Sequence, residues 1–127
     1  MAKSNGRDTF LRPQTGPIDR EMFFFYLEMW HSGDRKCLIL MTDKDGRTHG
    51  TFACEVGRSD GAMLLASFQC VDFPLVLDFS GAESFTYLDY NDAAVNAQMR
   101  EYFEAGYSAW LQARLRAGTT VNLLLKT

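Results

Sequence analysis

Residues 91–118 read NDAAVNAQMREYFEAGYSAWLQARLRAG, and their large apolar side chains recur at steps of three and four residues. This spacing places the side chains along one side of an α-helix, from where they can cover a sheet. They are Val95, Met99, Tyr102, Phe103, Tyr107, Trp110, Leu111 and Leu115. Asn91 or Asp92 can cap the start of the helix, and Gly118 can end it in a left-handed conformation. The sequence therefore predicts one long C-terminal helix, with a bend near Gly106.

The rest of the chain has the pattern of short β-strands separated by turns. Residues 51–56 alternate, so that Phe52, Cys54 and Val56 share one face of a strand. Turn signals such as Asp45 followed by Gly46 recur at intervals of roughly 8–12 residues, which is typical of an antiparallel sheet. We expect strands at residues 22–30, 36–42, 51–56, 62–71, 75–79, 84–88 and 119–126, the last of them inserted beside an earlier strand. The predicted fold class is α+β: an antiparallel β-meander of about six strands, one long C-terminal amphipathic helix packed on the sheet, and a final strand.

The expected first strand carries four consecutive aromatic side chains, Phe23, Phe24, Phe25 and Tyr26. A strand would place two of them on each face, as in a central strand that is covered on both sides. If they were exposed, the same rings would form a platform for a partner, but stacking proteins usually combine such a platform with a basic groove. We therefore expect a covered central strand here.

Composition and charge favour one soluble domain. The chain has 127 residues, of which 46% are hydrophobic and 23% charged. Residues 1–20 hold six charged side chains and few apolar ones, so we expect a flexible N-terminal arm followed by a single α+β domain at residues 21–127. The formal net charge of -3 argues against a nucleic-acid partner. Because the sequence contains neither a membrane-spanning apolar stretch nor a secretory leader, we expect a cytoplasmic protein with no membrane partner.

Neither the cysteines nor the histidines have the spacing of a metal site. Cys37, Cys54 and Cys70 stand 17 and 16 residues apart and form no CxxC pair, which is typical of buried thiols in a reducing compartment. His31 and His49 are the two histidines, and their distances from the cysteines match no pair of zinc ligands. We therefore expect reduced thiols and no metal.

The patterns of catalytic sites are also missing from the sequence. The chain has no Gly-x-Ser-x-Gly elbow and no glycine-rich phosphate loop. The loop that begins at Asp43 lacks the oxygen ligands of an EF-hand at the required spacing. The sequence thus predicts no catalytic residue and no cofactor, and an enzyme is the less favoured interpretation.

Acidic side chains are concentrated in residues 71–104, which hold seven acidic side chains and one basic side chain. Aromatic residues are interleaved with them, and such a surface attracts basic proteins while it repels nucleic acid. The predicted partner-binding residues are Asp78, Glu83, Phe85, Tyr87, Asp89, Tyr90 and Asp92. A solvated face that only maintains solubility is the simpler explanation of the same charges.

The favoured function is a non-enzymatic binding protein that recognises or neutralises a basic protein partner through this acidic surface. Short acidic α+β domains without a catalytic constellation are common among small bacterial inhibitors, immunity proteins and adaptor modules, which is an analogy of class. One alternative is a small-ligand-binding domain or small enzyme with an aromatic pocket between sheet and helix. Another is an oligomeric structural subunit, such as a homodimer paired through a strand edge.

Overall fold

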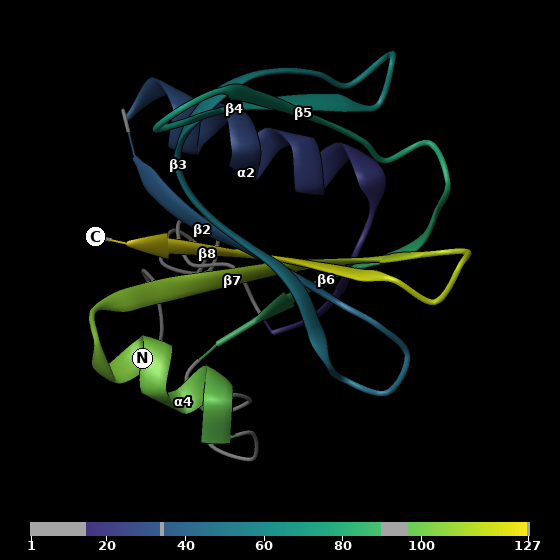
Figure 1. Ribbon diagram of the computed structural model, residues 1–127. Coiled ribbons are helices and arrows are strands. Elements are labelled where there is room, and N and C mark those ends of the chain that lie inside the picture. The colour runs from purple at the N-terminus through teal and green to yellow at the C-terminus, as the bar shows by residue number, and fades with distance from the viewer. Residues whose placement is uncertain (1–14, 34, 90–96, 127) are drawn as a thin grey trace, which may run out of the picture.

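The computed structural model describes residues 15–33, 35–89 and 97–126. In these residues, eight strands form one antiparallel sheet in the order β1-β6-β7-β8-β2-β3-β4-β5. The strands are β1 (Gly16–Ile18), β2 (Lys36–Thr42), β3 (Thr48–Asp60), β4 (Leu65–Cys70), β5 (Pro74–Asp78), β6 (Ala82–Leu88), β7 (Tyr107–Leu115) and β8 (Thr120–Lys126). Two helices, α2 (Arg20–Ser32) and α4 (Ala97–Glu104), lie on opposite sides of the sheet (Figure 1). Within the described ranges, neither helix has the length and apolar composition needed to cross a membrane.

The prediction of one long C-terminal helix is wrong. Helix α4 ends at Glu104, and Gly106 has a φ of 113°, a conformation that residues with a side chain rarely adopt. From Tyr107 onward the chain forms β7, which pairs with both β6 and β8. Trp110 and Leu111 are both buried, one on each face of the sheet. The part of the apparent helical stripe that begins at Tyr107 therefore consists of positions in a strand covered on both faces, whereas Met99, Tyr102 and Phe103 belong to α4 and Val95 lies outside the described residues. The fold is mostly an eight-stranded antiparallel sheet with two short helices.

The prediction of a strand at residues 22–30 is also wrong, because these residues belong to α2. The Asp19 carboxylate caps this helix by accepting a hydrogen bond from the Met22 amide at 2.7 Å. The buried residues of α2 are Phe23, Phe24, Leu27 and Trp30. They recur with the period of a helix, so the run of consecutive aromatic residues points partly toward the sheet and partly toward solvent.

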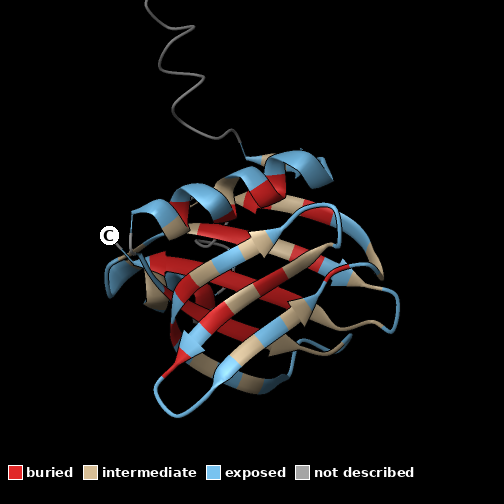
Figure 2. Cartoon of the chain, turned by 90° about the horizontal axis from the view of Figure 1, so that it is seen from above, coloured by how far each residue is buried: buried red, intermediate tan, exposed pale blue. Residues whose placement is uncertain are grey.

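Helix α2 lies in the concave side of the strongly curved sheet (Figure 1). Figure 2 shows buried residues in red on the side of α2 that faces the sheet and exposed residues in pale blue on its other side. Aromatic rings make up much of this inner core: the centroids of Phe23 and Phe85 are 4.5 Å apart, and those of Phe23 and Phe79 are 5.1 Å apart. These rings pack tightly between the helix and the sheet.

A second, outer core lies on the convex side of the sheet beneath α4. Its buried members are Leu38, Leu40, Met99, Trp110 and Leu124. In β2 these leucines alternate with residues of the inner core, so this strand is buried on both faces. Strand β8 is likewise buried on both faces and pairs with β2 and β7. The prediction that the last strand inserts beside an earlier one is therefore confirmed.

The N-terminal part of the described chain belongs to the sheet. Residues 16–18, which we expect in the N-terminal arm, form β1 and pair with residues 85–87 of β6. Strand β1 leads directly to the Asp19 cap of α2. The remaining part of the expected arm, residues 1–14, lies outside the described residues.

Candidate functional site

Two of the predicted partner-binding residues, Asp78 and Glu83, lie on either side of the turn that joins β5 to β6. Both are exposed, and the Asp78 carboxylate accepts a hydrogen bond from the Ser80 amide at 2.8 Å. Hydrogen bonds from Ser80 hold the pKa of Asp78 below its usual value. Asp89 follows the opposite end of β6, so the structure separates it from this pair by the length of the strand.

The predicted aromatic residues of this region point into the inner core. Phe85 contacts Phe23 and is 8% exposed, and the ring of Tyr87 lies 5.9 Å from that of Tyr26. Burial raises the pKa of the Tyr87 hydroxyl. Phe85 and Tyr87 therefore do not share a surface with the exposed carboxylates of β5 and β6. The last two predicted residues, Tyr90 and Asp92, lie outside the described residues.

Large apolar side chains are instead exposed along the solvent side of α2. Met22, Phe25 and Met29 are 41%, 47% and 48% exposed. Their spacing of three and four residues aligns them along one side of the helix. The carboxylates of Glu21 and Glu28 lie beside them and are exposed as well. We call these five residues the α2 surface.

Two shallow hollows meet at Phe25 and Glu28 within the α2 surface. One has a volume of about 340 Å³ and extends from the helix to Ser59 and Gly61 at the end of β3. The other has a volume of about 410 Å³ and extends along the helix past Met29. The ring of Phe25 thus forms a ridge with space on both sides, which a partner's side chains can occupy.

Turns beside the α2 surface add further acidic groups. The Asp60 carboxylate accepts a hydrogen bond from the Met63 amide at 3.1 Å, and the Met63 side chain is 63% exposed. The rings of Phe24 and Phe79 lie 6.1 Å apart, which places the turn after Asp78 next to the same helix. Glu21, Glu28 and Asp60 therefore lie near the exposed apolar side chains of α2, together with Arg20, which lines the first hollow.

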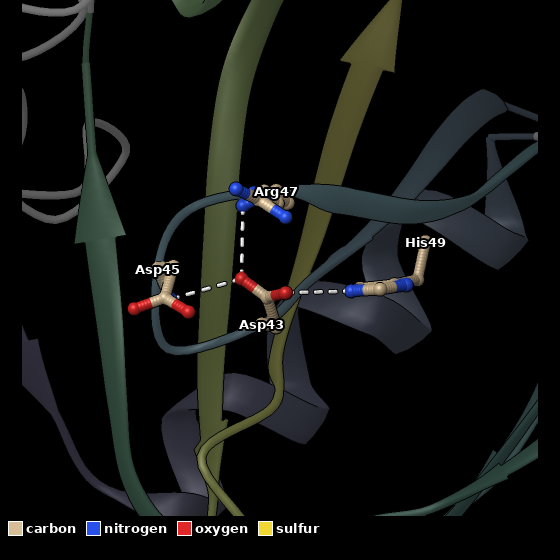
Figure 3. A network of polar contacts seen from close by, with 4 residues as sticks. All are labelled: Asp43, Asp45, Arg47 and His49. Atoms are coloured by element: carbon tan, nitrogen blue, oxygen red, sulfur yellow. Dashed lines mark hydrogen bonds and ion pairs between the residues drawn. The ribbon is translucent and has the colours of Figure 1, made fainter.

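The two histidines take part in separate local contacts. His31 Nδ1 lies 3.2 Å from the Val56 carbonyl oxygen. His49 Nε2 lies 2.6 Å from Asp43 Oδ2, while Asp43 Oδ1 accepts hydrogen bonds from two amides of the β2–β3 turn (Figure 3). These hydrogen bonds, above all the one with His49, hold the pKa of Asp43 below its usual value. No group of three or more His, Cys, Asp or Glu side chains that could hold a metal ion occurs in the part of the chain that the structure describes.

The three cysteines are buried, as predicted, but they also lie side by side. Cys37 is directly opposite Cys54 in the β2–β3 pair, and Cys54 is directly opposite Cys70 in the β3–β4 pair. The spacing of the cysteines in the sequence is itself a signal for this arrangement. Cys37 and Cys54 lie eight residues on either side of the turn at residues 45–46, and Cys54 and Cys70 lie eight residues on either side of position 62. Residues equally distant from a hairpin turn face each other across the two strands. We call this row the cysteine ladder.

Two lysines face each other near the cysteine ladder. Lys36 of β2 is directly opposite Lys126 of β8, and the Lys126 ammonium lies 5.4 Å from the centroid of the Tyr107 ring. Both lysines line a hollow of about 600 Å³, together with the three cysteines. Among residues 15–33, 35–89 and 97–126, no carboxylate lies within ion-pair distance of either lysine. Lys36 is also directly opposite Glu55 of β3, and Glu55 lines the same hollow, so the hollow carries charges of both signs.

The α2 surface combines a helical row of exposed apolar side chains with flanking charge. Aromatic residues and methionine are enriched in the centres of protein–protein interfaces, and polar groups form their rims. The arrangement is thus suited chemically to contact with another protein. No family model, no curated protein and no solved structure matches this chain.

Proposed function

We propose that the protein is a non-enzymatic binding protein whose α2 surface holds a basic, apolar segment of a partner protein. The observation that carries the proposal is the row of Met22, Phe25 and Met29, which are 41–48% exposed between two hollows. A helix that packs against a sheet usually keeps such residues on its buried side. Here α2 has large apolar side chains on both sides.

The chemistry of the α2 surface favours a basic partner. Lysine and arginine carry long aliphatic stems that pack on apolar side chains while their charged groups reach carboxylates. Met22 and Met29 are flexible and adapt to different contact shapes. Glu21 and Glu28 can pair with the charged groups of the partner, and the net charge of -3 favours the approach of a basic protein.

This proposal keeps the partner class expected from the sequence and moves the central contact to α2. Phe25 is the aromatic side chain that the partner would bury at the centre of the contact, because Phe85 and Tyr87 are already packed in the inner core. Asp78 and Glu83 lie on the neighbouring turn, where peripheral charges can steer association.

A selection from a random peptide library on the immobilised protein tests the proposal. Enriched peptides should carry a net positive charge together with apolar side chains. Phe25→Ala should weaken their binding by about tenfold or more, because truncation of a buried aromatic anchor typically costs at least 1–2 kcal/mol. Phe73→Ala is the matched control, since Phe73 is 42% exposed but lies in the β4–β5 turn. Acidic enriched peptides, or equal binding to wild type and Phe25→Ala, would contradict the proposal.

The contribution of charge is tested with the same peptides. The double variant Glu21→Lys, Glu28→Lys should reduce the association rate constant by about tenfold at low salt, and the loss should shrink as salt screens the charges. The double variant Glu101→Lys, Glu104→Lys changes the net charge equally on α4, where both residues are exposed. An equal slowing in both double variants would show that the overall charge, and not the α2 surface, controls association.

A further inference from the structure

The cysteine ladder brings thiols from three neighbouring strands together on the side of the sheet that faces α2. Cys37, Cys54 and Cys70 are all free, and they are 2%, 8% and 6% exposed. All three belong to the inner core. A row of this kind offers two neighbouring pairs of thiols, which share Cys54.

Backbone hydrogen bonds determine which two thiols lie closest. In an antiparallel sheet, hydrogen-bonded pairs alternate with non-hydrogen-bonded pairs, whose side chains are closer. The Cys70 amide donates to the Phe73 carbonyl at 3.0 Å, so the backbone of Cys70 is bonded toward β5 and not toward β3. Cys54 and Cys70 therefore form a non-hydrogen-bonded pair, whose Cα atoms lie about 4.5 Å apart in a regular sheet. A disulfide forms over Cα separations of about 4.4–6.8 Å, so this pair can be bridged in place.

Cys37 and Cys54 form the other kind of pair. The Val56 amide donates to the Arg35 carbonyl at 3.1 Å, two positions along the same ladder. The Cys37–Cys54 pair is therefore hydrogen-bonded, and its Cα atoms lie about 5.5 Å apart in a regular sheet. Cys37 is also the most deeply buried of the three. The closer side chains of the Cys54–Cys70 pair and the deeper burial of Cys37 favour the bond between Cys54 and Cys70.

The surroundings favour the thiolate form at Cys54 over the other two cysteines. Hydrogen bonds from the thiols of Cys37 and Cys70 lower the pKa of Cys54. The hydrogen bond with Cys54 and burial raise the pKa of Cys37, and burial raises that of Cys70. Because the thiolate is the attacking form in thiol–disulfide exchange, Cys54 reacts first.

We propose that Cys54 and Cys70 form a reversible cross-strand disulfide in exchange with a low-molecular-weight disulfide such as glutathione disulfide. The Cys54 thiolate attacks one sulfur of the reagent, whose S–S bond breaks and releases one glutathione thiolate, which takes up a proton. Cys70 then loses its proton to solvent and attacks the Cys54 sulfur of the mixed disulfide, releasing the second glutathione. Two protein thiols are oxidised and one reagent disulfide is reduced to two thiols, while Cys37 remains a thiol.

The position of the pair gives the reagent a route to it. Cys70 ends β4, and the next residue, Val71, is 90% exposed. Toward the edge of the sheet, β4 is followed only by the short strand β5.

Peptide mapping of the full-length protein tests this inference. Trypsin places Cys37 in residues 37–44, Cys54 in residues 48–58 and Cys70 in residues 59–100, so each cysteine has its own peptide. After incubation of the reduced protein with glutathione disulfide and alkylation of the remaining thiols, we expect residues 48–58 to be linked to residues 59–100. The intact protein should lose two hydrogen atoms, its alkylated thiols should fall from three to one, and dithiothreitol should reverse the change.

Single cysteine variants distinguish a specific Cys54–Cys70 disulfide from non-specific oxidation of the three thiols. Cys37→Ser should form the same link, whereas Cys54→Ser should form none, because Cys37 and Cys70 are separated by the width of β3. Cys70→Ser should stop at the mixed disulfide with glutathione on Cys54. Three alkylated thiols in the folded wild type after incubation, or a wild-type link between residues 37–44 and 48–58, would overturn the inference. The wild-type map gives this answer even where a variant does not fold.

Discussion

Asn122 is a buried polar side chain on the outer face of β8, where it joins three strands. Its Oδ1 accepts hydrogen bonds from the Trp110 indole at 2.9 Å and from the Gln112 amide at 3.0 Å. Its Nδ2 donates to the Leu40 carbonyl at 3.3 Å and lies 3.5 Å from Thr42 Oγ1. Because Asn122 and the Trp110 indole are buried and each satisfies the other, and Asn122 also bonds to β2, Asn122 holds β2, β7 and β8 in one register.

Asn122→Ala should therefore be strongly destabilising. We expect its free energy of unfolding in urea to fall by about 3 kcal/mol, because the substitution leaves the Trp110 indole N–H without its acceptor in the outer core. Trp110→Phe removes that donor and serves as the second arm of a double-mutant cycle. Asn122→Ala should cost less in the Trp110→Phe background than in wild type. An equal cost in both backgrounds would show that this hydrogen bond contributes nothing.

At the scale of elements, β5 lies at one edge of the sheet, and its sequence limits the pairing of another strand with its exposed backbone. The Cys70 amide donates to the Phe73 carbonyl and the Phe79 amide donates to the Leu64 carbonyl, so alternate residues of β5 face β4. Pro74 and Val76 therefore direct their backbone away from the sheet. Pro74 has no N–H to offer, which limits the pairing of another strand with this edge.

Pro74→Thr should consequently promote self-association. The substitution adds an outward N–H next to Val76, whose side chain is 60% exposed. We expect light scattering to show a larger mean mass as concentration rises, with the wild type unchanged over the same range. Adding Val76→Lys to this variant should reverse the effect, because lysine on an edge strand disfavours pairing. Association that persists in the double variant would place the contact elsewhere.

How far the sequence predicts an element depends on how local its signals are. Strand β2 has the predicted bounds, residues 36–42, because an apolar run between polar turns suffices to define it. The sequence does not predict β7, because burial on both faces removes the alternation of apolar and polar residues. Pairing with β6 and β8 makes this segment a strand. The sequence does not predict α2, because its run of aromatic residues has high β-propensity. The Asp19 cap and packing against the surrounding sheet make this segment helical.

The candidate site shows the same division between local and non-local information. The exposure of Asp78 and Glu83 follows from their places beside a turn, and the sequence indicates it. Phe85 and Tyr87 share one face of β6 by alternation, but which face is buried depends on where α2 lies. The sequence does not reveal the α2 surface, because a strand at residues 22–30 separates Met22, Phe25 and Met29 onto different faces, whereas a helix aligns them on one side.

In the whole molecule, the two cores share one sheet, and each core contains one of the chain's two tryptophans. Trp30 lies in the inner core and is 7% exposed, while Trp110 lies in the outer core and is 6% exposed. Strands β2 and β8 contribute side chains to both cores. Loss of one core therefore removes the support of the other.

We expect the two cores to unfold together. In Trp110→Phe the fluorescence of Trp30 reports the inner core, and in Trp30→Phe the fluorescence of Trp110 reports the outer core. In each variant, the denaturant midpoint from fluorescence should coincide with the midpoint from far-UV circular dichroism, as in a two-state transition. A fluorescence transition that precedes the loss of strand signal in either variant would show that its core melts separately.

The central position of β8 also constrains how the chain is made. Cys37 pairs with Leu125, which follows it by 88 residues, so the middle of the sheet is completed only after residue 126 has left the ribosome. Until then, the strands β2–β5 form one nascent fragment and β1, β6 and β7 form another, and β2 and β7 each have one unpaired side. Contacts this distant in sequence form slowly, and exposed strand edges are targets for aggregation. The nascent chain should therefore depend on chaperone protection until its synthesis passes β8.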